Sequence, residues 1–99
     1  MRPQTISITG TGETNALKVD FTQDNFKIGF GVVINGTVDY TVQHTFDDPN
    51  KVTPTWFDNE VVVNQIDNQD GNFAYPIRAL RLVNNSGTGT STMTILQGH

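Results

Sequence analysis

Apolar and polar residues alternate along most of this chain with a period of two. Residues 4–9 place isoleucine at every second position, between threonine and serine. Residues 17–22 do the same with leucine, valine and phenylalanine. This period is typical of strands that bury one face. Both segments therefore predict half-buried β-strands.

The central segment predicts two further strands and a turn between them. Residues 26–34 and 37–46 alternate over long stretches and flank Asn35-Gly36. Because this dipeptide tolerates positive φ angles at both turn positions, we predict a β-hairpin here. Gly29 and Gly31 share the face of the first strand opposite its apolar residues. Glycine weakens a strand, so the pair indicates a bulge, a sharp bend or close approach of another backbone.

The segment after this predicted hairpin is less regular. Residues 47–59 contain Pro49 and Pro54 and predict an irregular loop. Residues 60–66 fit neither a strand nor a helical turn cleanly. Residues 67–72, with the sequence DNQDGN, predict a loop with an Asp-Gly turn.

The C-terminal part returns to strand patterns. Residues 77–83 are apolar on both faces, as expected of a central strand or one covered by a partner chain. Residues 84–89 predict a hairpin loop, and residues 90–97 predict a closing strand. The whole pattern predicts an all-β fold of six to eight short strands, a small antiparallel β-sandwich or barrel, immunoglobulin-like or jelly-roll-like. We expect one domain over residues 1–99, with a short N-terminal arm at residues 1–4.

Composition and charge narrow the classes of partner. The chain has no cysteine, which excludes disulfides and thiolate metal sites. Its net charge of −4 with only six scattered basic residues argues against nucleic-acid binding. No apolar run is long enough for a membrane span, and the N-terminus lacks a secretory signal pattern. We therefore expect assembly in a cytoplasm, with no nucleic-acid or membrane partner.

No arrangement of residues predicts catalysis. The sequence contains three serines and two histidines but no G-x-S-x-G motif. His44 lies within a predicted strand and is expected to be a half-buried structural residue, and His99 is the last residue. We expect no enzymatic activity, no catalytic residue and no cofactor.

Metal and sugar binding are weakly indicated. The segment DNQDGN lacks the ligand spacing and distal glutamate of a calcium loop, so we expect no metal site. Trp56, Tyr40 and Tyr75 could stack on a sugar, but core packing is the expected role of aromatics in so small a chain. The low apolar content of 35% and the strand at 77–83 instead favour burial against other chains.

Several distinctive segments lie along almost the whole chain. The most distinctive are H-T-F-D-D-P and P-I-R-A-L-R-L, and the others are I-T-G-T-G, G-F-G-V-V-I-N-G-T-V-D-Y-T-V-Q, W-F-D, G-N-F-A-Y and S-G-T-G-T-S-T-M-T-I-L-Q-G. Together they resemble a family of small virion structural proteins of tailed bacteriophages, considered capsid decoration (cement) proteins.

This resemblance implies a protein of the virion that bridges major capsid subunits, or binds other virion proteins, on the outer head surface. An acidic surface suits that position, away from packaged DNA. We expect a homo-oligomer, dimer or trimer. Alternatives are a tail, collar or fibre-attachment subunit, or a carbohydrate-binding adhesion module. The expected contacts lie in the N-terminal arm and in loops 47–60 and 67–75, at Arg2, Pro3, Trp56, Phe57, Phe73 and Tyr75.

Overall fold

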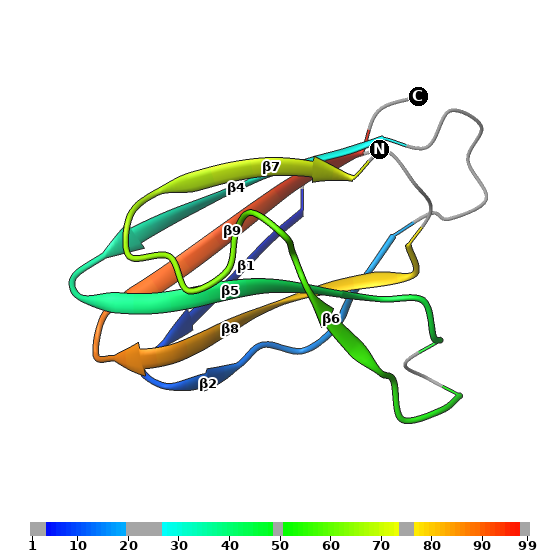
Figure 1. The fold of residues 1–99 in the computed structure, drawn as a ribbon, viewed down its shortest axis with the longest axis horizontal. Coiled ribbons are helices and arrows are strands. Elements are labelled where there is room, and N and C mark those ends of the chain that lie inside the picture. Colours follow the sequence, from blue (N-terminus) through cyan, green and yellow to red (C-terminus); the bar gives the residue numbers. More distant parts are fainter. Residues whose placement is uncertain (1–3, 20–26, 49–50, 74–76, 98–99) are drawn as a thin grey trace.

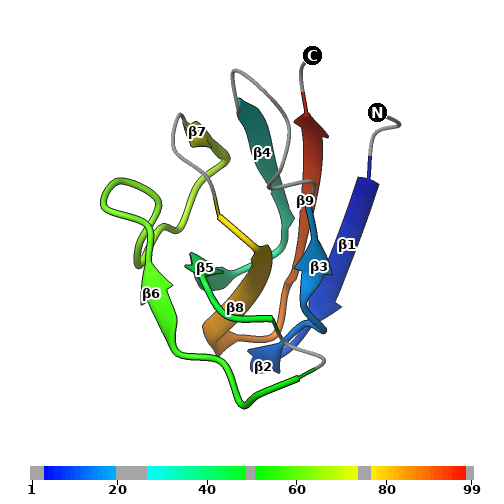
Figure 2. The same cartoon turned by 90° about the vertical axis from the view of Figure 1, so that its right-hand side faces the viewer.

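The structure, a computed structural model, describes residues 4–19, 27–48, 51–73 and 77–97 and contains two antiparallel sheets packed face to face (Figures 1 and 2). The first sheet has the order β1 (Gln4–Thr9), β9 (Thr90–Gln97), β4 (Ile28–Asn35), β7 (Gln69–Phe73). The second has the order β2 (Gly12–Glu13), β8 (Ala79–Gly87), β5 (Val38–Thr45), β6 (Trp56–Asp58), and β3 (Leu17–Lys18) also pairs with β8. The predicted all-β sandwich is confirmed.

The strand order is that of a jelly roll. β2 and β3 pair with successive parts of β8, so they act as one strand interrupted at residues 14–16. Counted in this way, a sheet of order 1-8-3-6 faces a sheet of order 2-7-4-5. Gln4, which the prediction places in the N-terminal arm, is the first residue of β1 and pairs with Ile95. The described residues form no helix that could cross a membrane.

The predicted hairpin at Asn35-Gly36 is wrong in its pairing. The turn exists, and Gly36 has a φ of +91°. However, β4 pairs with β9 and β7 while β5 pairs with β8 and β6, so the turn crosses from one sheet to the other. A two-residue turn reverses the chain sharply but does not require the two arms to pair. Here each arm joins a different sheet, and the apolar faces of the two sheets pack against each other. The predicted hairpin loop at 84–89 is wrong for the same reason, because β8 continues to Gly87 and the chain then crosses to β9.

Three such crossings lie together at one end of the sandwich, on the left of Figure 1. They connect β1 to β2, β4 to β5 and β8 to β9. The N–H of Gly10 donates to Gly89 O at 3.0 Å, and the N–H of Gly89 donates to Thr37 O at 2.8 Å. A Cβ on Gly89 would lie 2.7 Å from Asn35 O, so the close approach of these backbones requires glycine.

Two strands lie in segments predicted as loops. β6 occupies part of 47–59, and β7 includes Asp70-Gly71, which is therefore not a turn. A Cβ on Gly71 would lie 2.7 Å from the ring of Phe30, so this glycine makes room for a core side chain. Residues 60–66 form bends and an isolated bridge to β5. Two backbone hydrogen bonds between Gln65 and Tyr40, of 2.8 and 2.9 Å, and one from the N–H of Val42 to Val62 O, of 3.0 Å, hold the segment to β5.

The core lies between the sheets and is built from the inward-facing residues of both. It contains Ile28, Phe30, Val32, Val38, Tyr40, Val42, Val62, Phe73, Ile77, Leu80, Leu82, Met93 and Ile95, with Val19 at its margin. β8 lies between β2 and β5 in its sheet, with Leu80 and Leu82 in the core and Arg81 and Val83 partly exposed on the outer face. The pairing of β4 is uninterrupted at Gly29 and Gly31, and a Cβ on either would meet no described atom within 4 Å. A bulge or close approach of a described segment therefore does not explain these glycines.

Candidate functional site

Four aromatic side chains form a cluster that begins in the core and ends at the surface. We call His44, Phe46, Phe57 and Phe73 the aromatic cluster. The ring centroid of His44 lies 5.5 Å from Phe46, 5.9 Å from Phe57 and 5.0 Å from Phe73. Phe46 and Phe57 are also in contact, with centroids 5.8 Å apart. These distances lie within the range of favourable aromatic pairs.

The cluster presents two phenylalanine rings to solvent. Phe73 and His44 are buried, with exposed fractions of 1% and 6%, whereas Phe46 and Phe57 are exposed by 49% and 48%. The buried rings support the exposed pair from below. The exposed rings form an apolar surface whose side chains are positioned by the buried rings beneath them. Such a surface is typical of protein-binding sites.

The register between β5 and β6 positions the exposed pair. Phe57 lies opposite His44 on the face of the second sheet that looks into the sandwich. The connection before β6 is fixed by Asp47, whose Oδ2 accepts from the N–H of Thr55 at 2.8 Å, and by Thr45, whose hydroxyl donates to Thr55 O at 2.8 Å. These bonds hold the neighbouring segment against the end of β5.

Trp56 lies on the opposite face of β6, because successive residues of a strand point to opposite sides. The guanidinium of Arg81 lies 4.4 Å from the centroid of its ring, a cation–π contact. Sequence neighbours Trp56 and Phe57 therefore belong to different surfaces.

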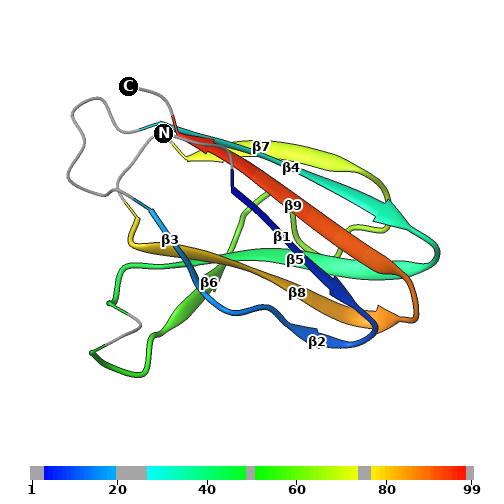
Figure 3. The same cartoon turned by 180° about the vertical axis from the view of Figure 1, so that it is seen from behind.

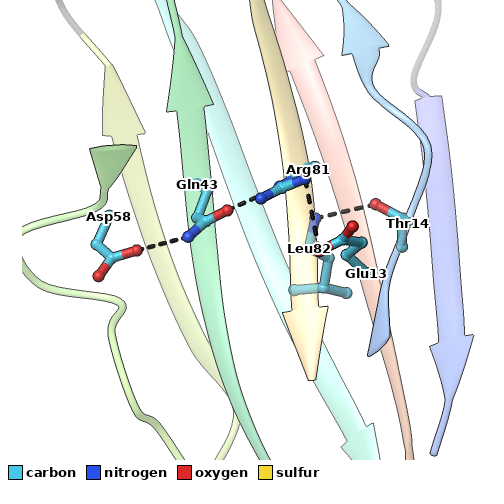
Figure 4. Close-up of polar contacts among 6 residues, drawn as sticks. All are labelled: Glu13, Thr14, Gln43, Asp58, Arg81 and Leu82. Carbon is cyan, nitrogen blue, oxygen red and sulfur yellow. Dashed lines mark hydrogen bonds and ion pairs between the residues drawn. The ribbon is translucent and has the colours of Figure 1, made fainter. Parts of the chain in front are cut away.

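Arg81 is part of a row of polar side chains that crosses the outer face of the second sheet (Figure 4). Gln43 donates through Nε2 to Asp58 Oδ1 at 2.8 Å, Arg81 donates through Nε to Gln43 Oε1 at 2.7 Å, and Arg81 lies 3.6 Å from Glu13. The row links β6, β5, β8 and β2 in turn. Because each side chain of the row contacts a side chain of an adjacent strand, the row stabilises the sheet.

Burial controls the charge state of the cluster. Removal of His44 from water lowers its pKa below the usual 6.5, so the imidazole is neutral at pH 7 and the cluster is uncharged. Burial and the nearby Asp67 carboxylate likewise raise the pKa of Tyr40 to about 12. The Tyr40 hydroxyl donates to Asp67 O at 2.6 Å, and this side chain is a core residue, not a sugar platform.

The six predicted contact residues have different outcomes. Phe57 is exposed within the cluster, and Trp56 is partly exposed on the other face. Phe73 faces the core, opposite Ile28, and is buried beneath the surface that Phe46 and Phe57 form. Arg2, Pro3 and Tyr75 lie outside the described residues. Phe46 was missed because it continues the alternating pattern of 37–46 and so resembles a core residue.

The described ranges contain no group of three or more histidine, aspartate or glutamate side chains placed to hold a metal ion. His44 is buried, more deeply than the half-buried position predicted for it. The His44 ring contacts the rings of three phenylalanines, so the groups around it are suited to binding an apolar group.

Comparison with known proteins supports the fold. No protein-family model matches the sequence, and no curated protein sequence matches it. Among solved structures, the chain is similar to one from Bacillus endospore appendages, described as a novel family of disulfide-linked pili, with 12% identity and a TM-score of 0.50. The match covers 95% of this chain and 82% of that one, so it extends over the whole β-sandwich.

Proposed function

We propose that this protein is a non-enzymatic structural subunit of a bacteriophage particle, a decoration protein that bridges major capsid subunits on the outer surface of the head. The observation that carries the proposal is the exposed pair Phe46 and Phe57, in mutual contact and supported by two buried rings. Aromatic anchors of this kind contribute most of the binding energy in protein interfaces.

The support beneath the pair favours binding over incidental exposure. Phe57 stacks on His44, which also contacts Phe73, so the exposed rings have little freedom left to lose on association. Modest contacts of this size become effective when many copies bind one particle and each neighbour is contacted more than once.

The segments that carry the family resemblance also supply this surface. H-T-F-D-D-P contains His44 and Phe46, W-F-D contains Phe57, and G-N-F contains Phe73. These segments are far apart in the sequence, and the fold brings their aromatic residues together.

A second candidate is a subunit of a self-assembling appendage, such as a tail, collar or fibre-attachment part. The fold likeness to the chain from disulfide-linked pili favours it. Because this chain has no cysteine, disulfides could not link its copies in such an assembly.

Binding to purified phage heads that lack this protein tests the proposal. We expect the wild-type protein to occupy symmetry-related positions on the heads, as seen by electron cryomicroscopy. Phe57→Ser should reduce the affinity by roughly 30-fold, since a central aromatic anchor contributes about 2 kcal/mol.

Val61→Ser is the matched control, because Val61 is 67% exposed and makes none of the ring contacts of the cluster. It should bind like the wild type. Absence of wild-type protein from the heads, or its recovery on the tail, would exclude a decoration role. Equal occupancy by Phe57→Ser would exclude the aromatic cluster as the contact.

A further inference from the structure

β1 is an edge strand whose sequence is symmetric. Residues 5–9 read Thr-Ile-Ser-Ile-Thr in both directions. The strand pairs with β9 along all six of its residues and with no other strand of the described chain (Figure 3). In an antiparallel ladder the backbone groups of alternate residues point away from the partner, so one side of β1 has N–H and C=O groups available.

The other sheet edges carry features that discourage pairing with another chain. β7 contains Asp70 and Gly71, and the three-residue β6 ends at Asp58. β2 and β3 have two residues each, with Glu13 and Lys18. Short length and charge are the usual means of protecting an edge. β1 has six residues without a charge or proline, and its pairing with β9 shows no bulge.

We propose that β1 pairs with β1 of a second copy, antiparallel, about a two-fold axis that passes beside Ser7. A two-fold axis places residue i opposite j and j opposite i. Around Ser7, the symmetric sequence places Ile6 opposite Ile8 of the partner copy and Thr5 opposite Thr9 of the partner copy. Pairs of β-branched residues directly opposite each other stabilise antiparallel strands.

The partly buried isoleucines of β1 support this arrangement. Ile6 and Ile8 pack against the core but remain partly exposed at the edge of the sandwich. Pairing of the two strands would place the isoleucines of one copy beside those of the other and continue the apolar layer across the axis. The two four-stranded sheets would become one eight-stranded sheet.

The symmetric sequence identifies a second copy as the occupant, and the distribution of charge allows it to bind at this edge. Each chain has a net charge of −4, so two copies repel each other over most of their surface. β1, β9 and β4 contain no charged residue, which makes this part of the first sheet the place where repulsion is least. A charged residue at position 7 would face its own copy across the axis, and serine avoids that.

The absence of cysteine allows a direct test by cross-linking. In the proposed dimer the two residues at position 7 have Cα atoms about 4.5–5.5 Å apart, which a disulfide can span. We therefore expect Ser7→Cys to form a covalent dimer under mild oxidation. Thr94→Cys is the control, because Thr94 is exposed on the same sheet but lies one strand inward. It should form no covalent dimer over the same time.

Sedimentation equilibrium of the full chain measures the association itself. We expect the wild type to dimerise and Ser7→Lys to weaken the dimer at least about 10-fold through like charges facing across the axis. Thr94→Lys adds the same charge away from the edge and should retain the dimer.

A wild-type protein that stays monomeric up to about 1 mM would overturn the proposal. Equal cross-linking of the two cysteine variants, or equal weakening by the two lysine variants, would also overturn it. The inference does not depend on the proposed function, because these measurements use the isolated protein. Failure to bind phage heads would leave the dimer result unchanged.

Discussion

At the scale of single residues, Asn84 connects the two sheets at the end where the glycine-rich crossings lie. It is 1% exposed, in the second sheet, and its Nδ2 donates to Ile8 O at 3.2 Å and Gly10 O at 2.8 Å. Its Oδ1 accepts from the hydroxyl of Ser91 in β9. One buried amide thus provides hydrogen-bond partners for polar groups of two strands in the opposite sheet. Because these groups are shielded from water, the amide takes the place of solvent as their partner.

Asn84→Ala should destabilise the protein by about 2–3 kcal/mol, because it leaves buried polar groups without their partner. Chemical denaturation followed by circular dichroism measures the change. Ser86→Ala, at an exposed position of the same strand, is the control and should change the free energy of unfolding by less than about 0.5 kcal/mol. A midpoint for Asn84→Ala equal to that of the control would show that the amide is dispensable.

His44 should make stability depend on pH. The unfolded imidazole takes up a proton near pH 6.5, whereas burial lowers the pKa of the folded one. Below pH 6.5 the unfolded state therefore binds more protons, and the free energy of unfolding falls as the pH decreases. Denaturation of wild type and His44→Phe between about pH 5 and 7 tests this. The variant should lose most of that slope, and an unchanged slope would contradict the role of His44.

At the scale of the strand, substitution of a glycine in β4 and of a glycine in β7 should change the free energy of unfolding in opposite directions, because the two glycines face opposite sides of the first sheet. A Cβ on Gly31 meets open space, whereas a Cβ on Gly71 meets the ring of Phe30. Gly31→Ala should raise the free energy of unfolding by about 0.5–1 kcal/mol, since glycine loses more conformational freedom on folding. Gly71→Ala should lower it by about 1–3 kcal/mol through overpacking. Thermal denaturation compares them, and destabilisation by both would show that Gly31 has a structural role.

The alternating pattern was sufficient to locate the long strands but not the short ones. The predictions at 4–9 and 90–97 coincide with β1 and β9, because isoleucine and methionine recur there at every second position. β7 was missed because Asp70-Gly71 has the composition of a turn, and only the ring of Phe30 explains a glycine in that strand. Such a reason lies in a contact between distant segments, which no local pattern contains.

Prediction of strand pairing and of the candidate site from the sequence is limited in the same way. Asn35-Gly36 predicts a reversal correctly, yet whether its arms pair depends on which sheet each arm joins. Phe57 could be proposed from its loop-like segment, whereas Phe46 could not, because its exposure follows from its place beyond the end of β5. Pairing and exposure are properties of the assembled sandwich.

At the scale of the whole molecule, the jelly-roll order separates neighbours in space from neighbours in sequence. Of the connections between successive strands, β5 to β6 joins two strands that pair with each other, while those at the glycine-rich end cross between sheets. Most strand contacts therefore close long loops, which is characteristic of folds that form slowly. Because the chain crosses repeatedly between the two sheets, each sheet depends on the other for its stability. Such a fold can hold surface side chains in fixed positions.

The position of β9 has a consequence for biosynthesis. Among the described strands, β9 is synthesised after all the others, and it lies in the middle of the first sheet, between β1 and β4. Until β9 is made, β1 has no partner in its own sheet, and its Thr-Ile-Ser-Ile-Thr segment stays unpaired. The pair of β4 and β7 can form earlier, but β1 can join this sheet only after β9 has been synthesised.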